Sequence, residues 1–172
     1  MKSICIPIGE DCYSAKYLIK ENKRSFSTIF DWIVIPPESI FKLFENDFKD
    51  FLIYDNLKII CNSKRKFKHA EIEIFDLCYN ILIPHHFNNL EEDYLIIYNK
   101  FNDRINKLRK ILIDNDNIFF YYKETIENSV LFRNIDPKLK YKFGKNNMKI
   151  YEKKLQNIIK INYNCDISFI YL

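Results

Sequence analysis

Short apolar runs alternate with longer amphipathic segments along most of this 172-residue chain. The apolar runs occupy residues 3–8, 56–62, 71–77, 78–84, 117–122 and 166–172, and helical spacing occupies residues 12–22, 36–53, 89–114 and 147–161. Strands that alternate with helices are typical of α/β domains, in which crossover helices join parallel strands. The pattern therefore predicts one α/β domain over residues 1–172, with three layers formed by a mostly parallel sheet and helices on both faces. The two adjacent runs near residues 71–83 could instead form an antiparallel hairpin.

The cysteine pattern restricts the chemistry more than the overall composition does. Five cysteines occur at wide spacings without a CxxC pair, which argues against a disulfide framework and against a structural zinc site. Reduced thiols are typical of the cytoplasm, so we expect a cytoplasmic protein with no bound metal and no cofactor. No apolar run reaches 18 residues, and the net charge of +4 is only mildly basic. The composition thus predicts a soluble domain without a membrane segment.

Polar residues that follow the predicted strands are the candidates for a functional site. In a parallel α/β sheet, ligands bind beyond the carboxyl ends of the strands. Cys12 follows the first strand, His85 and His86 follow another, and Lys123 follows a third. If these strands are parallel, the four side chains collect at one edge of the sheet.

Cys12 has two interpretations. The start of a helix favours a thiolate, and a nearby histidine could activate the thiol further. Glu10 and Asp11 precede it and carry negative charge, which opposes the thiolate. Cys12 also shares a helical face with Ala15 and Ile19, so it could be a small buried residue. Spacing alone favours this packing role.

Two histidines and one aspartate could assist a Cys12 nucleophile. Neighbouring residues on a strand point to opposite faces, so at most one of His85 and His86 lines the site. A histidine at a strand end can act as a general base, and Asp31, in "IFDWI", can orient it as the third member of a triad does. A carboxylate among apolar residues is costly to bury unless it is paired, so Asp31 could equally pin its loop through backbone N–H groups.

Two segments, residues 64–69 and 138–145, mix lysines with aromatic residues. Such mixtures bind single-stranded nucleic acid through charge and stacking. More often they are solvated loops, so the sequence does not favour a nucleic-acid partner. Nucleic-acid binding would require both segments to lie on one face.

Four motifs, taken in order, resemble a known family. They are "IGEDCYSA" at residues 8–15, "RSFSTIFDWI" at 24–33, "IPHHF" at 83–87 and "IFFYYK" at 118–123. Together they resemble a bacterial and viral family of papain-like cysteine peptidases that is classed as a domain of unknown function. The order and spacing fit over roughly residues 3–171.

The resemblance implies that Cys12 is the nucleophile, His85 the base and Asp31 the orienting acid. The residues that we expect to contact a substrate beside them are Gly9, Asp11, Trp32, His86 and Lys123. The chain departs from the family where His86 replaces an acid, Ile29 replaces a proline and Lys123 replaces an arginine.

Three functions remain open on these grounds. The first is a thiol-dependent hydrolase or acyl-transfer enzyme acting on a peptide, an amide or a thioester. The second is a non-catalytic domain that binds a ligand such as a glycan, with Cys12 as packing. The third is a nucleic-acid-binding module. The sequence leaves the substrate and the oligomeric state open.

Overall fold

The computed structural model describes residues 4–24, 26–67, 70–124 and 143–172. The strands are β1 (Ile4–Pro7), β2 (Leu57–Phe67), β3 (Ala70–Asp76), β4 (Ile81–Phe87), β5 (Asn117–Tyr122) and β6 (Asp166–Tyr171). The α-helices are α1 (Tyr13–Lys20), α2 (Pro37–Glu45), α3 (Leu90–Asp114) and α5 (Lys145–Tyr163), and two 3-10 turns are η1 (Ile29–Asp31) and η2 (Tyr54–Asn56). The prediction of a mixed α/β protein is confirmed for this part of the chain.

The strands form two separate sheets of three strands each. In the first, which we call the parallel sheet, β5 lies between β1 and β6, and both pairings are parallel. In the second, the antiparallel sheet, β3 lies between β2 and β4. The prediction of one mostly parallel sheet is therefore wrong for the run at 56–62, which lies in β2. Strands β2, β3 and β4 follow one another without an intervening helix, and such short connections permit only antiparallel pairing.

The hairpin expected near residues 71–83 is confirmed. Strands β3 and β4 pair antiparallel, with Ile74 opposite Ile83 and Asp76 opposite Ile81. The chain reverses through residues 77–80, where Asn80 has a left-handed backbone with φ of 56°. Asparagine tolerates this conformation better than most residues, which explains why the turn can be this tight.

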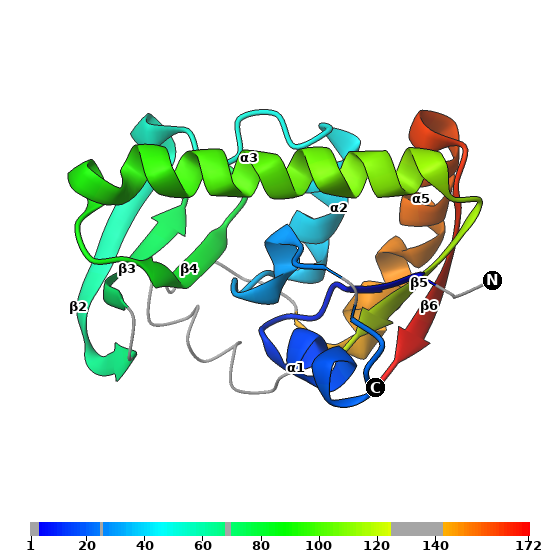
Figure 1. Ribbon diagram of the computed structural model, residues 1–172, viewed down its shortest axis with the longest axis horizontal. Coiled ribbons are helices and arrows are strands. Elements are labelled where there is room, and N and C mark those ends of the chain that lie inside the picture. Colours follow the sequence, from blue (N-terminus) through cyan, green and yellow to red (C-terminus); the bar gives the residue numbers. More distant parts are fainter. Residues whose placement is uncertain (1–3, 25, 68–69, 125–142) are drawn as a thin grey trace.

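Helix α3 runs along the molecule past both sheets, as Figure 1 shows in green. Asn89 begins it by accepting hydrogen bonds from the backbone N–H groups of Glu91 and Glu92, whose charges suit the helix N-terminus. One cluster of buried side chains includes residues of β1, α2, β3, α3 and β5, such as Ile6, Phe44, Ile74, Phe101 and Phe120. Among the described helices, none is long and apolar enough to cross a bilayer.

The helix expected over residues 36–53 is shorter than the apolar spacing suggests. Helix α2 begins at Pro37 and ends at Glu45. The N–H of Asn46 donates to the carbonyl of Lys42 at 3.0 Å, and the N–H of Asp47 donates to that of Phe44 at 3.3 Å. The residues beyond it include several with left-handed backbones, among them Asp47 and Phe48. A right-handed helix cannot continue through such positions.

A short segment after η1 connects the two sheets. Val34 forms an isolated antiparallel bridge with Leu82 of β4, and the two exchange N–H···O bonds of 2.8 and 3.0 Å. The N–H of Ile35 donates to the carbonyl of Glu10, 3.1 Å away, in the loop that follows β1. Residues 32–35, which we call the bridging segment, thus position the β1–α1 loop relative to β4.

Asp76 holds the β3–β4 turn from inside the protein. Its fully buried carboxylate accepts from the N–H groups of Leu52, Cys78 and Tyr79 at 2.8 to 3.0 Å. Burial raises the pKa of Asp76, and these three backbone donors lower it.

We expect Asp76→Ala to lower the free energy of unfolding by about 3 kcal/mol or more, because it leaves buried donors without an acceptor. Urea denaturation would measure this, and an Asp76→Ala protein as stable as wild type would contradict it.

Candidate functional site

Cys12 lies where the parallel sheet meets α1. Beyond the end of β1, the chain stays beside β5, since the N–H groups of Ile8 and Glu10 donate to the carbonyls of Tyr121 and Lys123 at 3.0 and 3.2 Å. Cys12 is then the N-cap residue of α1, and its thiol is reduced and half-buried. The expected meeting of the β1 and β5 strand ends is therefore observed.

Asp11 stabilises the start of α1 without being its N-cap. Its Oδ1 accepts from the backbone N–H of Tyr13 at 2.8 Å, and its side chain is only 8% exposed. The carboxylate thus satisfies one of the N–H groups that a helix start leaves unpaired. The Asp11 carboxylate is therefore hydrogen-bonded to the backbone next to Cys12.

Gly9 allows α1 to pack closely onto the β1–α1 loop. A Cβ atom at this position would overlap the hydroxyl of Ser14 and would lie 3.0 Å from the carbonyl oxygen of Lys123. The Ser14 hydroxyl can rotate away, but the Ser14 Cβ, also 3.0 Å from the added atom, and the Lys123 carbonyl are held by the backbone. Glycine is required here for space, and this spacing sets the height of Cys12 above the sheet.

Glu10 has a structural role that the sequence did not reveal. It is fully buried, and its Oε1 accepts short hydrogen bonds from the hydroxyl of Tyr122 and the N–H of Gly144. Burial first, and then the charge of Glu10, raise the pKa of Tyr122. The partners lie 112 and 134 residues away in sequence, so no local pattern could have indicated them.

Lys123 and Tyr13 form the exposed side of this region. The ammonium of Lys123 lies 5.1 Å from the centre of the Tyr13 ring, and that of Lys16 lies 5.3 Å from it. These are cation–π distances. Tyr13 is 48% exposed, so a ligand approaching Cys12 would meet this ring and two positive charges.

The two histidines occupy opposite faces of β4, as the alternation of strand side chains requires. His85 is half-buried and meets the Trp32 ring edge-on, with ring centres 6.0 Å apart. His86 meets Phe101 of α3 edge-on at 5.3 Å, and its buried Nε2 has no hydrogen-bond partner. His86 therefore faces α3, away from the Trp32 side of the strand.

His85 and Cys12 do not lie at the end of one parallel sheet, as they would if their strands were parallel neighbours, because β4 belongs to the antiparallel sheet. The bridging segment provides the link instead. It joins the β1–α1 loop through Ile35 and joins β4 through Val34, while Trp32 at its start contacts His85. Within the described residues, no hydrogen bond connects the Cys12 thiol with His85.

Asp31 is fully buried, and its carboxylate is occupied by its own loop. Its oxygens accept from the backbone N–H and the hydroxyl of Thr28 at 3.0 and 3.1 Å, and from the guanidinium of Arg24. Burial raises the pKa of Asp31, while Arg24 and Thr28 lower it. Thr28 and Asp31 form a capping box around η1, the turn that ends at Trp32. This matches the pinning role that the sequence allowed for Asp31.

The two basic segments cannot be compared on one surface. Residues 138–142 and 68–69 lie outside the described residues, so the nucleic-acid hypothesis stays untested. In the part of the chain that the structure does describe, no group of three or more His, Cys, Asp or Glu side chains is arranged to hold a metal ion.

These features define a mixed α/β protein with a partly exposed thiol at the start of a helix, beside the ends of two parallel strands. A sequence profile of the family described as "Putative papain-like cysteine peptidase" matches residues 3–163. The chain belongs to this family, as the four motifs indicated. No curated protein and no solved structure matches the chain significantly.

The close contact at Gly9 gives a first prediction about this region. Gly9→Ala should lower the free energy of unfolding by about 2 kcal/mol, because the Ser14 hydroxyl must rotate and the Ser14 Cβ and the Lys123 carbonyl cannot move away without shifting backbone. The added Ser14→Gly change should recover part of this loss, since it removes one of the two collisions. Chemical denaturation of the single and double variants measures both effects. Equal stability of Gly9→Ala and wild type would show that the loop and α1 are not packed this closely.

The buried imidazole of His86 predicts a pH dependence of stability. Burial is the main cause that lowers its pKa from 6.5 to about 3, assisted by the charges of Lys100 and Arg104. Between pH 6.5 and about 3, the unfolded chain protonates this imidazole whereas the folded protein keeps it neutral. The free energy of unfolding therefore falls as the pH drops from 6.5 towards 3. The slope from this group is at most about 1.4 kcal/mol per pH unit.

His86→Leu should reduce this slope, because it removes the group that takes up the proton on unfolding. Urea denaturation of both proteins at several pH values between 4 and 7 tests it, and the free energy of unfolding of wild type should fall relative to that of His86→Leu as the pH is lowered. Parallel curves would mean that His86 is not held neutral in the folded protein.

Proposed function

We propose that the protein is a thiol-dependent hydrolase or acyl-transfer enzyme in which Cys12 is the nucleophile and His85 the base. The observation that carries this proposal is the place of Cys12, a reduced and half-buried thiol at the start of α1 beside the strand ends. Membership of a family named for cysteine peptidases supports the reaction class.

In this reaction the Cys12 sulfur attacks the carbonyl carbon of a peptide, amide or thioester, and His85 takes the thiol proton. The carbonyl oxygen gains negative charge, which the N–H groups at the start of α1 stabilise. Collapse of this intermediate expels the amine or thiol, which leaves with the proton from His85. Water, or another acceptor, then attacks the thioester on Cys12 and restores the thiol.

Asp31 acts in this proposal through Trp32 rather than by touching His85. Its capping box shapes the turn that ends at Trp32, and the Trp32 ring packs against the His85 imidazole. Arg24 compensates the charge of the buried carboxylate. Asp31 is thus a positioning residue that fixes the wall against which His85 rests.

The substrate would lie over the exposed rim beside Cys12. Gly9 leaves room for close approach to the loop backbone, and Asp11 fixes the start of the helix. Lys123, held over the Tyr13 ring, and Trp32 are the side chains that we assign to contact with the substrate. His86 takes no part, because it faces α3.

A second candidate is a non-catalytic binding domain that uses the same rim. The observation that favours it is that no hydrogen bond connects Cys12 with His85 among the described residues, and that His85 lies on β4 in the antiparallel sheet while Cys12 follows β1 of the parallel sheet. Catalysis requires the two side chains to come within hydrogen-bond reach in the free protein in solution. A binding domain requires no such approach.

Thiol labelling separates the two functions. We expect iodoacetamide to modify Cys12 about tenfold or more faster than Cys78 at pH 6.5, because a histidine-paired thiol is a thiolate at that pH. Cys78 is a matched internal control, since it is more exposed, and burial and the charges of Asp76 and Asp50 raise its pKa. Peptide mapping after short exposures gives the rate at each site.

His85→Asn should bring the Cys12 rate down to that of Cys78, and Cys12→Ser should abolish labelling at this site. If Cys12 and Cys78 react equally slowly in wild type, or if His85→Asn leaves fast labelling unchanged, the assigned pair is wrong. The binding-domain function would then be the better account.

A further inference from the structure

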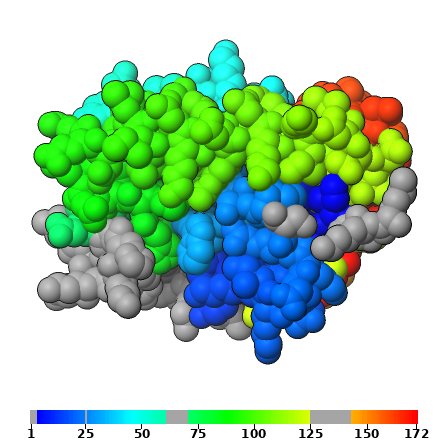
Figure 2. All heavy atoms as spheres, viewed as in Figure 1, coloured from blue at the N-terminus to red at the C-terminus, as the bar shows by residue number. Residues whose placement is uncertain are grey.

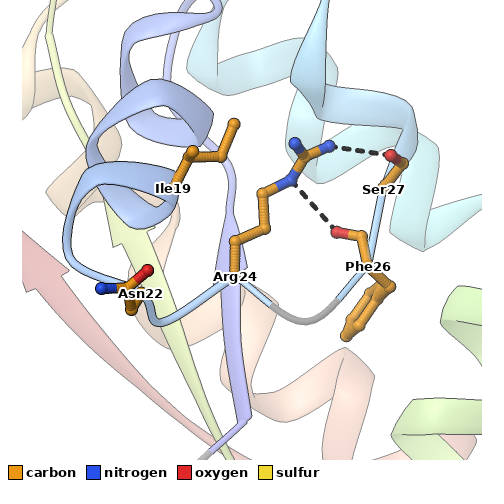
Figure 3. A pocket seen from close by; sticks show the side chains of 5 residues that line it. All are labelled: Ile19, Asn22, Arg24, Phe26 and Ser27. Carbon is orange, nitrogen blue, oxygen red and sulfur yellow. Dashed lines mark hydrogen bonds between the residues drawn. The ribbon is translucent and has the colours of Figure 1, made fainter.

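A pocket lies at the end of α1 that is opposite to Cys12. Its volume is about 360 Å³, and its lining residues are Ile19, Asn22, Arg24, Phe26 and Ser27. Eight helical residues span about 12 Å, so this pocket is separate from the start of α1. Figure 3 shows its residues coming from the end of α1 and from the chain that leads towards η1.

The guanidinium of Arg24 is fixed at this pocket by three partners. Its Nε donates to the carbonyl of Phe26 at 3.2 Å, and its Nη2 donates to the hydroxyl of Ser27 at 2.8 Å and to Asp31. Figure 3 shows these bonds to Phe26 and Ser27 on one side of the group. The third nitrogen, Nη1, takes part in none of the hydrogen bonds found among the described residues. A guanidinium held in one orientation binds an oxyanion without losing further side-chain freedom.

Positive charge around this pocket exceeds the negative charge that compensates it. Asp31 is the carboxylate that pairs with Arg24. Burial lowers the pKa of Arg104 of α3, and the nearby charge of Asp31 raises it while that of Arg24 lowers it further. The buried Nη1 of Arg104 has no hydrogen-bond partner. Lys107, one turn further along α3, places its ammonium 5.4 Å from the centre of the Phe26 ring. Arg24 and Arg104 thus both interact with the one buried carboxylate of Asp31, Lys107 adds a positive charge beside Phe26, and none of the five lining residues is acidic.

Figure 2 shows the blue chain that follows α1 directly beneath the green α3. The contact between Lys107 and Phe26 joins the two elements there.

The polar groups of the lining suit a single anionic group. The Ser27 oxygen accepts from Arg24, so its hydrogen can be donated elsewhere, and Asn22 adds an amide donor. Ile19 and Phe26 supply apolar contact area.

We propose that this pocket binds an oxyanion, a carboxylate or a phosphate, carried on a small apolar group. Arg24 Nη1 donates to the anion, the Ser27 hydroxyl and the Asn22 amide complete its hydrogen bonds, and the apolar part rests on Ile19 and Phe26. Lys107 and Arg104 add long-range attraction. The site is independent of whether Cys12 is a nucleophile.

Titration of the ¹⁵N-labelled full chain with benzoate and with phenyl phosphate tests the site, at constant ionic strength. Amide shifts of Asn22, Phe26 and Ser27 should saturate with both probes, and benzyl alcohol, which has no charge, should leave them unchanged. The tighter of the two anions identifies the chemical source of the group. Fluorescence of Trp32, the only tryptophan, gives a second readout, because Arg24 holds the turn that ends there.

Asn22→Asp should weaken both anions about fivefold, since it adds a like charge to the lining. Asn22 is exposed and has a left-handed backbone with φ of 52°, which aspartate also tolerates, so the fold should be retained. Asn164→Asp is the matched control, because Asn164 is also exposed at a helix end and has φ of 54°. It should leave both affinities unchanged.

The proposal is overturned if neither anion gives saturable shifts in the pocket residues, or if benzyl alcohol binds as well as benzoate. Equal weakening by Asn22→Asp and Asn164→Asp would overturn it too, because that result reflects net charge alone. Repeating the titration with Cys12→Ser should give the same affinities whatever the labelling of Cys12 shows. A failure of the catalytic proposal therefore leaves this result standing.

Discussion

The buried carboxylate of Asp31 fixes the chain at the point where the two sheets are joined. Removing a carboxylate from water costs several kcal/mol unless its oxygens are paired, and here Arg24 and Thr28 supply the partners. The geometry that they impose sets the direction of the chain as it leaves η1. From there the bridging segment reaches β4 on one side and the β1–α1 loop on the other. An apolar side chain at position 31 could also be buried, but it would not form the hydrogen bonds that direct the chain towards both sheets.

The dependence on Asp31 also relates the two regions that we assign to function. Arg24 lines the pocket beside α1, and it is the same guanidinium that neutralises Asp31. Trp32 follows Asp31 directly and forms one wall of the region that contains His85. Because a buried ion pair is sensitive to any new charge near it, an anion at Arg24 changes the electrostatic balance of the turn. The physical route between the pocket and His85 is therefore short and consists of residues already in contact.

Local sequence patterns predicted most elements and the β3–β4 hairpin, but not the division of the strands into two sheets. Helix α3 was recognisable because its apolar spacing, its acidic first turn and its cap all indicate the same structure. The opposite orientations of His85 and His86 followed from strand geometry alone. The division into two sheets could not be derived in the same way, since the residue pattern of a strand is the same whichever sheet it joins. The lack of a helix between β2, β3 and β4 was the available signal, and it indicates antiparallel pairing once the connection lengths are considered.

The charges around Cys12 show why the site was harder to predict than the fold. Sequence spacing places two acids before the thiol, and on that basis they oppose a thiolate. In the folded protein each is engaged elsewhere. Glu10 accepts from Tyr122 and Gly144, which lie far away along the chain, and Asp11 accepts from the start of α1. Both carboxylates are therefore hydrogen-bonded parts of the folded structure, which their place before Cys12 in the sequence does not reveal.

Lysine side chains, in contrast, approach the same region from elements that are separate in sequence. Lys16 comes from α1 and Lys123 from the end of β5, and both lie over the Tyr13 ring beside Cys12. The pairing of β1 with β5 thus brings Lys123 to the Tyr13 ring, next to Cys12 in the sequence. A parallel pairing that closes over more than 100 residues is a property of the fold, and the residues around Cys12 acquire their chemical character from it.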